Sequence, residues 1–142
     1  MKPSRLFAIA LFWFAIAIIL GAFAAHGLKG KLDEKALSWW LTAVEYHRIN
    51  ALGIGLYASW MQTQVLQTQV LQTQVLQTQA KSDEAHIKQM SIFFHIGLIL
   101  FSGSLYAMAL GGPRILGAIT PIGGATWILS WLYGAYVSFR RQ

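Results

Sequence analysis

The 142-residue chain contains no cysteine. This absence excludes disulfide bonds, thiolate metal sites and a cysteine nucleophile, although it does not identify the cellular compartment. Charge is also scarce, because only 11% of the residues are Asp, Glu, Lys or Arg, whereas 56% are hydrophobic. A chain of this length cannot enclose so much apolar surface in a water-soluble globule. The composition therefore predicts an integral membrane protein with one domain, covering residues 1–142.

Acidic residues are the scarcest charged group, with 5 Asp and Glu against 11 Lys and Arg. In a soluble chain, the resulting net charge of +6 would suggest a nucleic acid partner. Here the cations lie at the edges of apolar runs, where anionic lipid headgroups are the simpler partner. We therefore expect membrane lipids and no nucleic acid as partners, with a second copy of the chain or another membrane protein as the further candidate.

Four apolar runs approach the ~20 residues that a helix needs to cross roughly 30 Å of hydrocarbon. They predict membrane spans at residues 6–25, 41–61, 90–110 and 115–139. The first run could also belong to a cleaved signal peptide, but the apolar part of such peptides is usually only ~7–15 residues long, so we expect an uncleaved anchor. The predicted fold is an all-α integral membrane protein, a small bundle of four transmembrane helices.

A Gln-rich repeat separates the second and third runs. Residues 62–79 contain three QTQVL units with eight Gln and four Thr, which excludes burial in lipid. A period of five residues gathers the Val-Leu pairs on one side of neither a helix nor a strand. We interpret residues 62–80 as an inserted hairpin loop, mobile or partly helical, followed by the aqueous segment KSDEAHIKQ. A steric zipper and a functional role for the repeat are the alternatives.

Orientation is nearly undetermined by charge. Four spans would place both termini and the repeat on one side, with six Lys and Arg there against five on the other. Because the first helix usually weighs most, and Lys2 and Arg5 precede it, we predict cytoplasmic termini. Lys29, Lys31 and Lys35 favour the opposite orientation.

Small residues recur every four positions in the last two runs and predict helix contacts. Without a hydrophobic drive between helices in lipid, close backbone approach must supply the attraction. The two stripes, which we expect to be packing faces, are Gly103, Ala107 and Gly111 in the third run and Thr126, Ser130, Gly134 and Ser138 in the fourth.

Polar residues within or beside the runs are the only candidates for chemistry. Ionisable groups inside a membrane are energetically costly and are therefore candidates for function. A neutral imidazole that is hydrogen-bonded to a neighbouring helix would explain a buried histidine equally well. The second run also carries Arg48, three residues after its only acid, so that the two can pair on one helical face. The candidates for a polar interior are His26, Glu45, His47, Asn50, His95, Ser102 and Thr120.

His26 marks the end of the first helix, where an interfacial hydrogen bond is the simplest role. His47 and Asn50 share one helical face, and His95, Ser102 and Tyr106 share a face of the third run. The spacing of the histidines predicts no metal site, and no nucleotide-binding or hydrolase motif occurs. We therefore expect no catalytic residues, no metal and no cofactor.

Four segments together resemble a known family. They are GAFAAHGLKGKL (21–32), WLTAVEYHRINALGIGL (40–56), LFSGSLYAMAL (100–110) and LGAITPIGG with SW after it (116–124, 130–131). The chain resembles the domain of unknown function 423 family of small bacterial inner-membrane proteins, and distantly the eukaryotic transmembrane protein 256 group. Three features depart from the family pattern: Ala24 in place of a glycine, Asn50 in place of a common histidine, and the expanded repeat loop. The resemblance implies a four-helix protein of the inner membrane, and it implies no established activity.

Two functions stay open. The first is a structural or accessory membrane protein that acts through helix packing, self-association or a partner. The second is a carrier or channel for a small solute, a proton or a lipid, with a polar path lined by His47, Asn50, His95, Ser102 and Thr120. An enzyme would need an acid-base pair within hydrogen-bond reach, and only Glu45 with His26 or His47 offers one. We therefore do not expect an enzyme.

Overall fold

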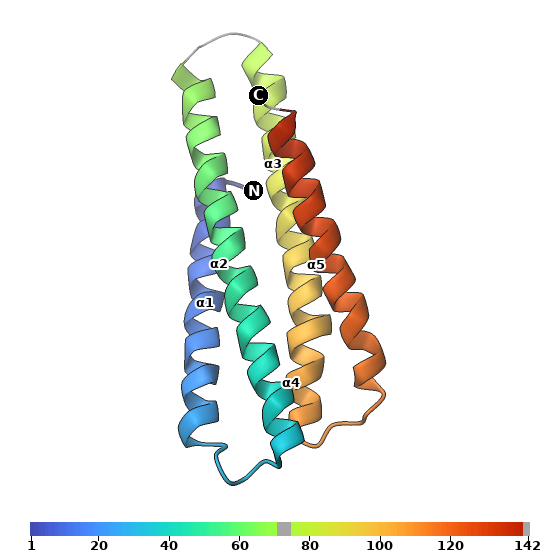
Figure 1. Cartoon of the computed structure of the whole chain (residues 1–142). Coiled ribbons are helices and arrows are strands. Elements are labelled where there is room, and N and C mark those ends of the chain that lie inside the picture. The colour runs from blue at the N-terminus through green and yellow to red at the C-terminus, as the bar shows by residue number, and fades with distance from the viewer. Residues whose placement is uncertain (71–74, 141–142) are drawn as a thin grey trace.

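The computed structural model describes the backbone of residues 1–70 and 75–140, and the side chains of residues 1–67 and 81–140. The helices are α1 (Pro3–His26), α2 (Glu34–Val70), α3 (Val75–Gly97), the π-helix η1 (Leu98–Gly103), α4 (Ser104–Ala109) and α5 (Leu116–Phe139). Because α3, η1 and α4 follow one another without a break, the described residues form four helical rods and contain no strand. The rods lie side by side in an elongated bundle (Figure 1). The expectation of an all-α fold is confirmed.

The rods form two hairpins, one made of α1 and α2 and the other of α3, η1, α4 and α5. Glycine makes both tight turns: Gly30 has a φ of 74° and Gly111 has a φ of 91°, values that favour a residue without a Cβ atom. Asp33 precedes α2, and its carboxylate accepts the backbone N–H of Ala36 at 2.7 Å. Pro113 follows the second turn and cannot continue the helical hydrogen bonds. Local turn chemistry therefore explains where both hairpins bend.

Helix α2 runs beyond residue 61, through the start of the repeat to Val70, and α3 begins at Val75. The repeat residues 71–74 lie outside the described residues, and so do the side chains of 68–80. In Figure 1, α2 and α3 extend past the beginning of α1. The interpretation of residues 62–80 as an insertion stays a prediction.

The aqueous segment after the repeat is part of the bundle. Its Asp83 and Ile87 have exposed fractions of only 1% and 0%. Both lie on the inner side of α3, four residues apart, so the first described turns of α3 already contribute to the core. Most of the segment is exposed, as its polar composition predicts, and only these two side chains turn into the bundle.

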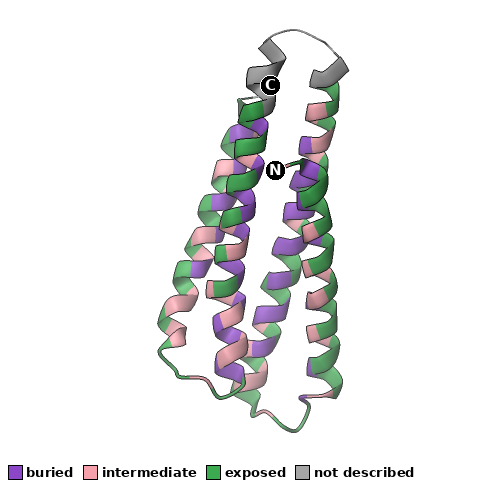
Figure 2. Ribbon diagram, turned by 180° about the vertical axis from the view of Figure 1, so that it is seen from behind, coloured by how far each residue is buried: buried purple, intermediate pink, exposed green. Residues whose placement is uncertain are grey.

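Apolar side chains occupy both the inside and the outside of the bundle. The inner faces carry the buried residues and the outer faces the exposed ones (Figure 2). Leu6, Ile54, Met90 and Phe94 belong to the largest buried cluster. The outer faces of all four rods also carry large exposed apolar side chains, among them Leu11, Leu52, Leu56, Ile99, Leu129 and Leu132.

Among the described residues, two helical stretches are long and apolar enough to cross a membrane, Pro3–His26 and Lys81–Ala109. The other two rods are less apolar for identifiable reasons. Helix α2 carries Glu45 and Arg48, and α5 contains several glycine and hydroxyl residues together with Pro121. Helix α5 nevertheless continues through this proline.

Candidate functional site

A cluster of hydrogen-bonded side chains lies between the two hairpins. Trp13 of α1 donates its indole N–H to Nε2 of His95 on α3, at 3.1 Å. The Nδ1 atom of His95 lies 2.7 Å from the backbone oxygen of Ser91. A carbonyl can only accept, so the hydrogen sits on Nδ1, and Nε2 is free to accept from the indole. Both ring nitrogens of His95 are therefore used, and the bonds fix one tautomer.

His47 of α2 is buried in the same cluster, with 2% of its surface exposed. Its Nδ1 atom lies 3.4 Å from the hydroxyl oxygen of Tyr106 on α4. The Trp13 ring centroid lies 5.6 Å from that of His47 and 6.1 Å from that of His95. Trp13 thus stands beside both histidines. The Nε2 atom of His47 is buried and has no hydrogen-bond partner in the described part of the chain.

Asn50 connects α2 to α5. Its Nδ2 donates to the backbone oxygen of Tyr46 at 2.9 Å, and its Oδ1 accepts the indole N–H of Trp131 at 2.9 Å. The sequence placed Asn50 on the same face as His47, and both side chains are buried. They meet different partners, however, because His47 contacts α4 whereas Asn50 contacts α5.

Ser102 and Ser104 lie in and next to the π-helix. Ser102 is fully buried and donates to the backbone oxygen of Ala43 on α2, at 3.0 Å. The hydroxyl oxygen of Ser104 lies 2.7 Å from that of Thr120 on α5 and 2.7 Å from the backbone oxygen of Leu100. A π-turn alters the pairing of backbone carbonyls, and the Ser104 hydroxyl lies within hydrogen-bond distance of two carbonyls of the π-helix, those of Leu100 and Phe101.

Two of the candidate residues do not join the cluster. His26 is exposed at the end of α1, and Glu45 is exposed on the outer side of α2. Arg48 is exposed as well, and the predicted pair between Glu45 and Arg48 is not among the salt bridges of the described residues. Both side chains are exposed, so each extends away from the bundle. Trp13 belongs to the cluster instead, and no polar pattern in the sequence marks it.

The small residues of the predicted stripes lie in different environments. Ser130 and Gly134 are buried against Met90 of α3. Gly111 is exposed in the turn after α4, and Gly103 and Ala107 are half-buried. The closest approach of a glycine to backbone atoms of another helix involves a glycine outside the stripes. A Cβ atom at Gly123 would lie only 2.4 Å from the backbone nitrogen of Phe101 in η1.

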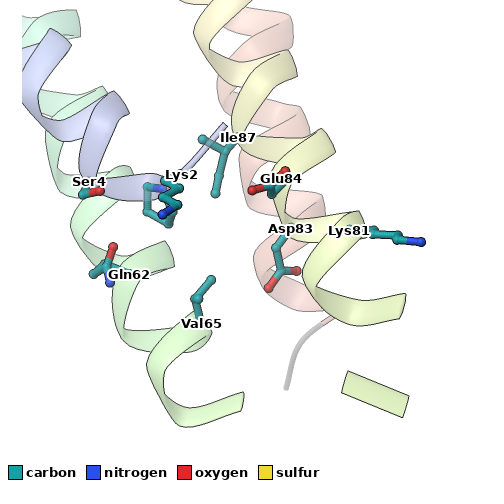
Figure 3. A pocket seen from close by; sticks show the side chains of 9 residues that line it. Lys2, Ser4, Gln62, Val65, Lys81, Asp83, Glu84 and Ile87 are labelled. Atoms are coloured by element: carbon teal, nitrogen blue, oxygen red, sulfur yellow. The ribbon is translucent and has the colours of Figure 1, made fainter. Parts of the chain in front are cut away.

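A pocket of about 370 Å³ opens between α1, α2 and α3 near the chain's beginning. Figure 3 shows Val65 and Asp83 pointing into the space between α2 and α3, while Lys81 points away. The Met1 ammonium lies 3.7 Å from the carboxylate of Glu84 and forms the one salt bridge among the described residues. Positive and negative side chains both line this pocket, which is bordered by Lys2, Pro3, Ser4, Gln62, Val65, Lys81, Asp83, Glu84 and Ile87.

His86 of α3 contacts α5, where its Nδ1 is hydrogen-bonded to the Tyr133 hydroxyl. Its Nε2 lies 3.1 Å from the hydroxyl of Ser82. In the part of the chain that the structure describes, no three His, Asp or Glu side chains come together in a way that would hold a metal ion. The internal arrangement is thus a set of paired hydrogen bonds between helices.

Comparison with known proteins identifies relatives over most of the chain. The model of the family described as "Protein of unknown function (DUF423)" matches residues 20–124. The UPF0382 membrane protein YwdK of Bacillus subtilis is 37% identical over 117 residues, which cover 82% of this chain and 81% of YwdK. A UPF0382 membrane protein of Haemophilus influenzae is 36% identical over 145 residues, covering 100% of this chain and 98% of the relative.

The UPF0382 inner membrane protein YgdD of Escherichia coli is 30% identical over 116 residues, covering 82% of this chain and 75% of YgdD. No solved structure matches the chain. The names of these relatives describe membrane location and no activity.

Proposed function

Since this chain belongs to the family of proteins of unknown function numbered 423, whose relatives are named membrane proteins, we propose that it is a four-span accessory protein of the bacterial inner membrane. In this role, the bundle offers packing surfaces to lipids and to a second copy of the chain or another membrane protein. It has no catalytic residues of its own and needs no cofactor.

The observation that carries the four-span topology is the exposure of large apolar side chains on every rod. Leu56 on α2 and Leu129 on α5 are 65% and 62% exposed. In water, a contiguous apolar surface on all sides would promote aggregation, whereas hydrocarbon solvates it. Among the polar residues of the same two rods, His47, Asn50 and Ser130 are buried, whereas Glu45 and Arg48 are exposed. This distribution supports spans at residues 41–61 and 115–139 in addition to 6–25 and 90–110.

The hydrogen bonds inside the bundle support an accessory role over a chemical one. Both ring nitrogens of His95 have partners, and Asn50 bonds to Trp131 and to the backbone. Groups that hold helices together in this way are not free to bind a substrate. The sequence offers Glu45 with His26 or with His47 as an acid-base pair. Glu45 and His26 are exposed on the surface, whereas His47 is buried.

Location and orientation are part of the same proposal. The name of the E. coli relative supports the inner membrane. The contact between Met1 and Glu84 supports a topology in which the beginning of the chain and the repeat segment share one side. Lys2 and Arg5 precede the first span, so we assign the termini to the cytoplasm.

One observation favours a carrier as the second candidate function. The Nε2 atom of His47 is buried and has no hydrogen-bond partner among the described residues, although such atoms normally have one. A buried polar atom of this kind would bind a passing water molecule or proton if a path reached it. The carrier function therefore requires that His47 be reachable from at least one side of the membrane.

Thiol labelling in sealed vesicles tests both the topology and the role. The chain has no cysteine, so each position can be replaced singly: His47→Cys, His95→Cys, Lys29→Cys and Lys88→Cys. With a membrane-impermeant reagent, we expect Lys88→Cys to label from the cytoplasmic side, Lys29→Cys from the other side, and neither histidine variant to label.

Labelling of Lys29→Cys and Lys88→Cys from the same side would refute four spans. Labelling of both histidine variants from one side, with protection by small ions or solutes, would replace the accessory role by a transport path. The two exposed lysine positions also serve as controls for reagent access.

A further inference from the structure

An apolar groove opens near the turns at the end of the bundle away from the chain termini. It has a volume of about 400 Å³ and lies between α2, η1, α4 and α5. Trp39, Leu105 and Pro121 are among its apolar lining residues, and Lys35 and Arg114 also line it. Lys35 belongs to the first turn of α2 and Arg114 to the α4–α5 turn, so the two cations come from different hairpins.

A second pocket, of about 510 Å³, adjoins this groove and shares Lys35, Trp39, Met108 and Arg114 with it. It adds Lys31, so three cations line the joined space, against the single carboxylate of Asp33. The Oδ1 atom of that carboxylate accepts the Ala36 N–H, and its negative charge offsets one of the three positive charges, so the lining stays net positive.

The cations of this space outnumber its one carboxylate and are not paired with it. None of Lys31, Lys35 and Arg114 forms a salt bridge within the described residues. The Lys35 ammonium lies over the Trp39 ring, 5.4 Å from its centroid, which places a positive charge beside an apolar wall. Together, a basic rim and an apolar groove match an amphiphile with an anionic head.

We propose that this space, which we name the basic groove (Lys31, Lys35, Trp39, Leu105, Arg114 and Pro121), binds one phospholipid with an anionic headgroup. The headgroup contacts the three cations, and an acyl chain lies along the apolar part. The proposal rests on the four-span topology, which brings the first turn of α2 and the α4–α5 turn to the same membrane surface.

Charge complementarity distinguishes this occupant from the others. A second copy of the chain docked symmetrically at the groove would bring like charges together. Free phosphate would match the cations but would leave the apolar part uncovered. The pocket at the opposite end differs, because Asp83 and Glu84 line it together with Lys2 and Lys81. The basic groove is therefore the better site for an anionic lipid.

Such a lipid would also have a structural effect. Lys35 and Arg114 belong to different hairpins, so one headgroup that contacts both would join the hairpins at this membrane surface. Assembly of the bundle in its accessory role would thus depend on the lipid composition of the membrane.

Native mass spectrometry of the full chain in detergent tests the site. The probes are phosphatidylglycerol and phosphatidylcholine with identical acyl chains. We expect one phosphatidylglycerol molecule to bind more tightly than phosphatidylcholine. Removing two cations in Lys35→Gln/Arg114→Gln should weaken phosphatidylglycerol about 30-fold, since each cation near an anionic lipid contributes close to a factor of five. Lys29→Gln/Arg140→Gln removes the same charge outside the groove and should bind as the wild type does.

A second variant tests the apolar part. A Cβ atom at Gly117 would lie 3.5 Å from the sulfur of Met108, which is an ordinary contact. Gly117→Leu should therefore fold, as circular dichroism and gel filtration would report, and its side chain should fill part of the groove. We expect it to lose bound phosphatidylglycerol although all three cations remain.

Equal binding of the two lipids by the wild type, or equal loss in the control variant, would overturn the proposal. Displacement of the lipid by inorganic phosphate at equal concentration would identify a simple anion site instead. A dimer that Gly117→Leu abolishes would identify a second copy of the chain as the occupant. The assay in detergent does not depend on vesicle sidedness, so failure of this proposal and failure of the topology are read separately.

Discussion

Inside each hairpin, small residues let the helices approach closely, and the indole N–H groups of Trp40 and Trp127 donate to backbone carbonyls of the neighbouring helix. Between the hairpins, indole N–H groups donate to polar side chains instead. Within the first hairpin, a Cβ atom at Gly55 would lie 3.3 Å from the Cβ atom of Ala10. Within the second, Gly123 approaches the backbone of η1 even more closely. Between the hairpins, Trp13 reaches His95 and Trp131 reaches Asn50.

The difference reflects how the two kinds of neighbours are connected. Helices of one hairpin are held side by side by a short turn, and close packing of small residues together with bonds to backbone carbonyls aligns them. The hairpins are joined only through the long repeat segment, which leaves their relative register open. Directional hydrogen bonds between side chains select one register, because a shift along the helix would leave buried polar groups unpaired.

Replacing Gly123 tests the tightest contact with backbone atoms inside a hairpin and should have the largest effect. In Gly123→Ala, the new methyl group would meet the backbone nitrogen of Phe101 at 2.4 Å, and backbone atoms cannot move aside easily. We expect a loss of about 1–3 kcal/mol in the free energy of unfolding. Unfolding in mixed detergent micelles with increasing dodecyl sulfate measures this loss.

The matched control is the neighbouring glycine. In Gly124→Ala, the methyl group would contact only the Phe101 ring at 3.5 Å, so the variant should match the wild type or gain stability from better helix propensity. Similar losses in both variants would mean that the close backbone contact at Gly123 does not distinguish the two positions.

Removing a bond between the hairpins should have an intermediate effect. Trp13→Phe keeps an aromatic ring but deletes the N–H that His95 accepts. Hydrogen bonds between membrane helices contribute on average ~0.6 and at most ~1.7 kcal/mol. A double-mutant cycle with His95→Leu isolates the bond, because Trp13→Phe should cost less once its partner is absent. Fully additive losses would show that Trp13 acts through packing alone.

Ser102→Ala tests a second hydrogen bond between the hairpins, one whose acceptor is a backbone carbonyl. The substitution removes the hydrogen bond to the Ala43 oxygen in a fully buried place. The carbonyl of Ala43 keeps its place in the α2 helix, so the expected loss is only about 0.5 kcal/mol. Hydrogen exchange at residues of α2 and η1 would detect a local opening. Unchanged exchange would leave no role for this bond in holding the hairpins together.

The sequence predicted the all-α fold because long apolar runs and glycine turns are local features of the chain. It also placed His47, Asn50 and Ser102 in the interior, since a membrane helix turns its polar side chains inward. It could not predict that Trp13 stands between two histidines, because that contact depends on how the hairpins pack. For the same reason, the burial of Asp83 within a charged segment and the close fit at Gly123 became visible only in three dimensions.

The smallest effect is expected at Gly21. Replacing this residue tests whether the first hairpin is packed as tightly as the second is at Gly123. A methyl group in Gly21→Ala would lie 3.3 Å from Cγ1 of Val44, so this one side chain would have to shift by a few tenths of an ångström while no backbone atom is in the way. The gain in helix propensity, about 1 kcal/mol, should offset this cost, so unfolding should remain within roughly 0.5 kcal/mol of the wild type. A loss as large as that of Gly123→Ala would show that the first hairpin is as tightly constrained as the second. The two hairpins would then be alike in their internal packing, and only the contacts between the hairpins would differ from those within them.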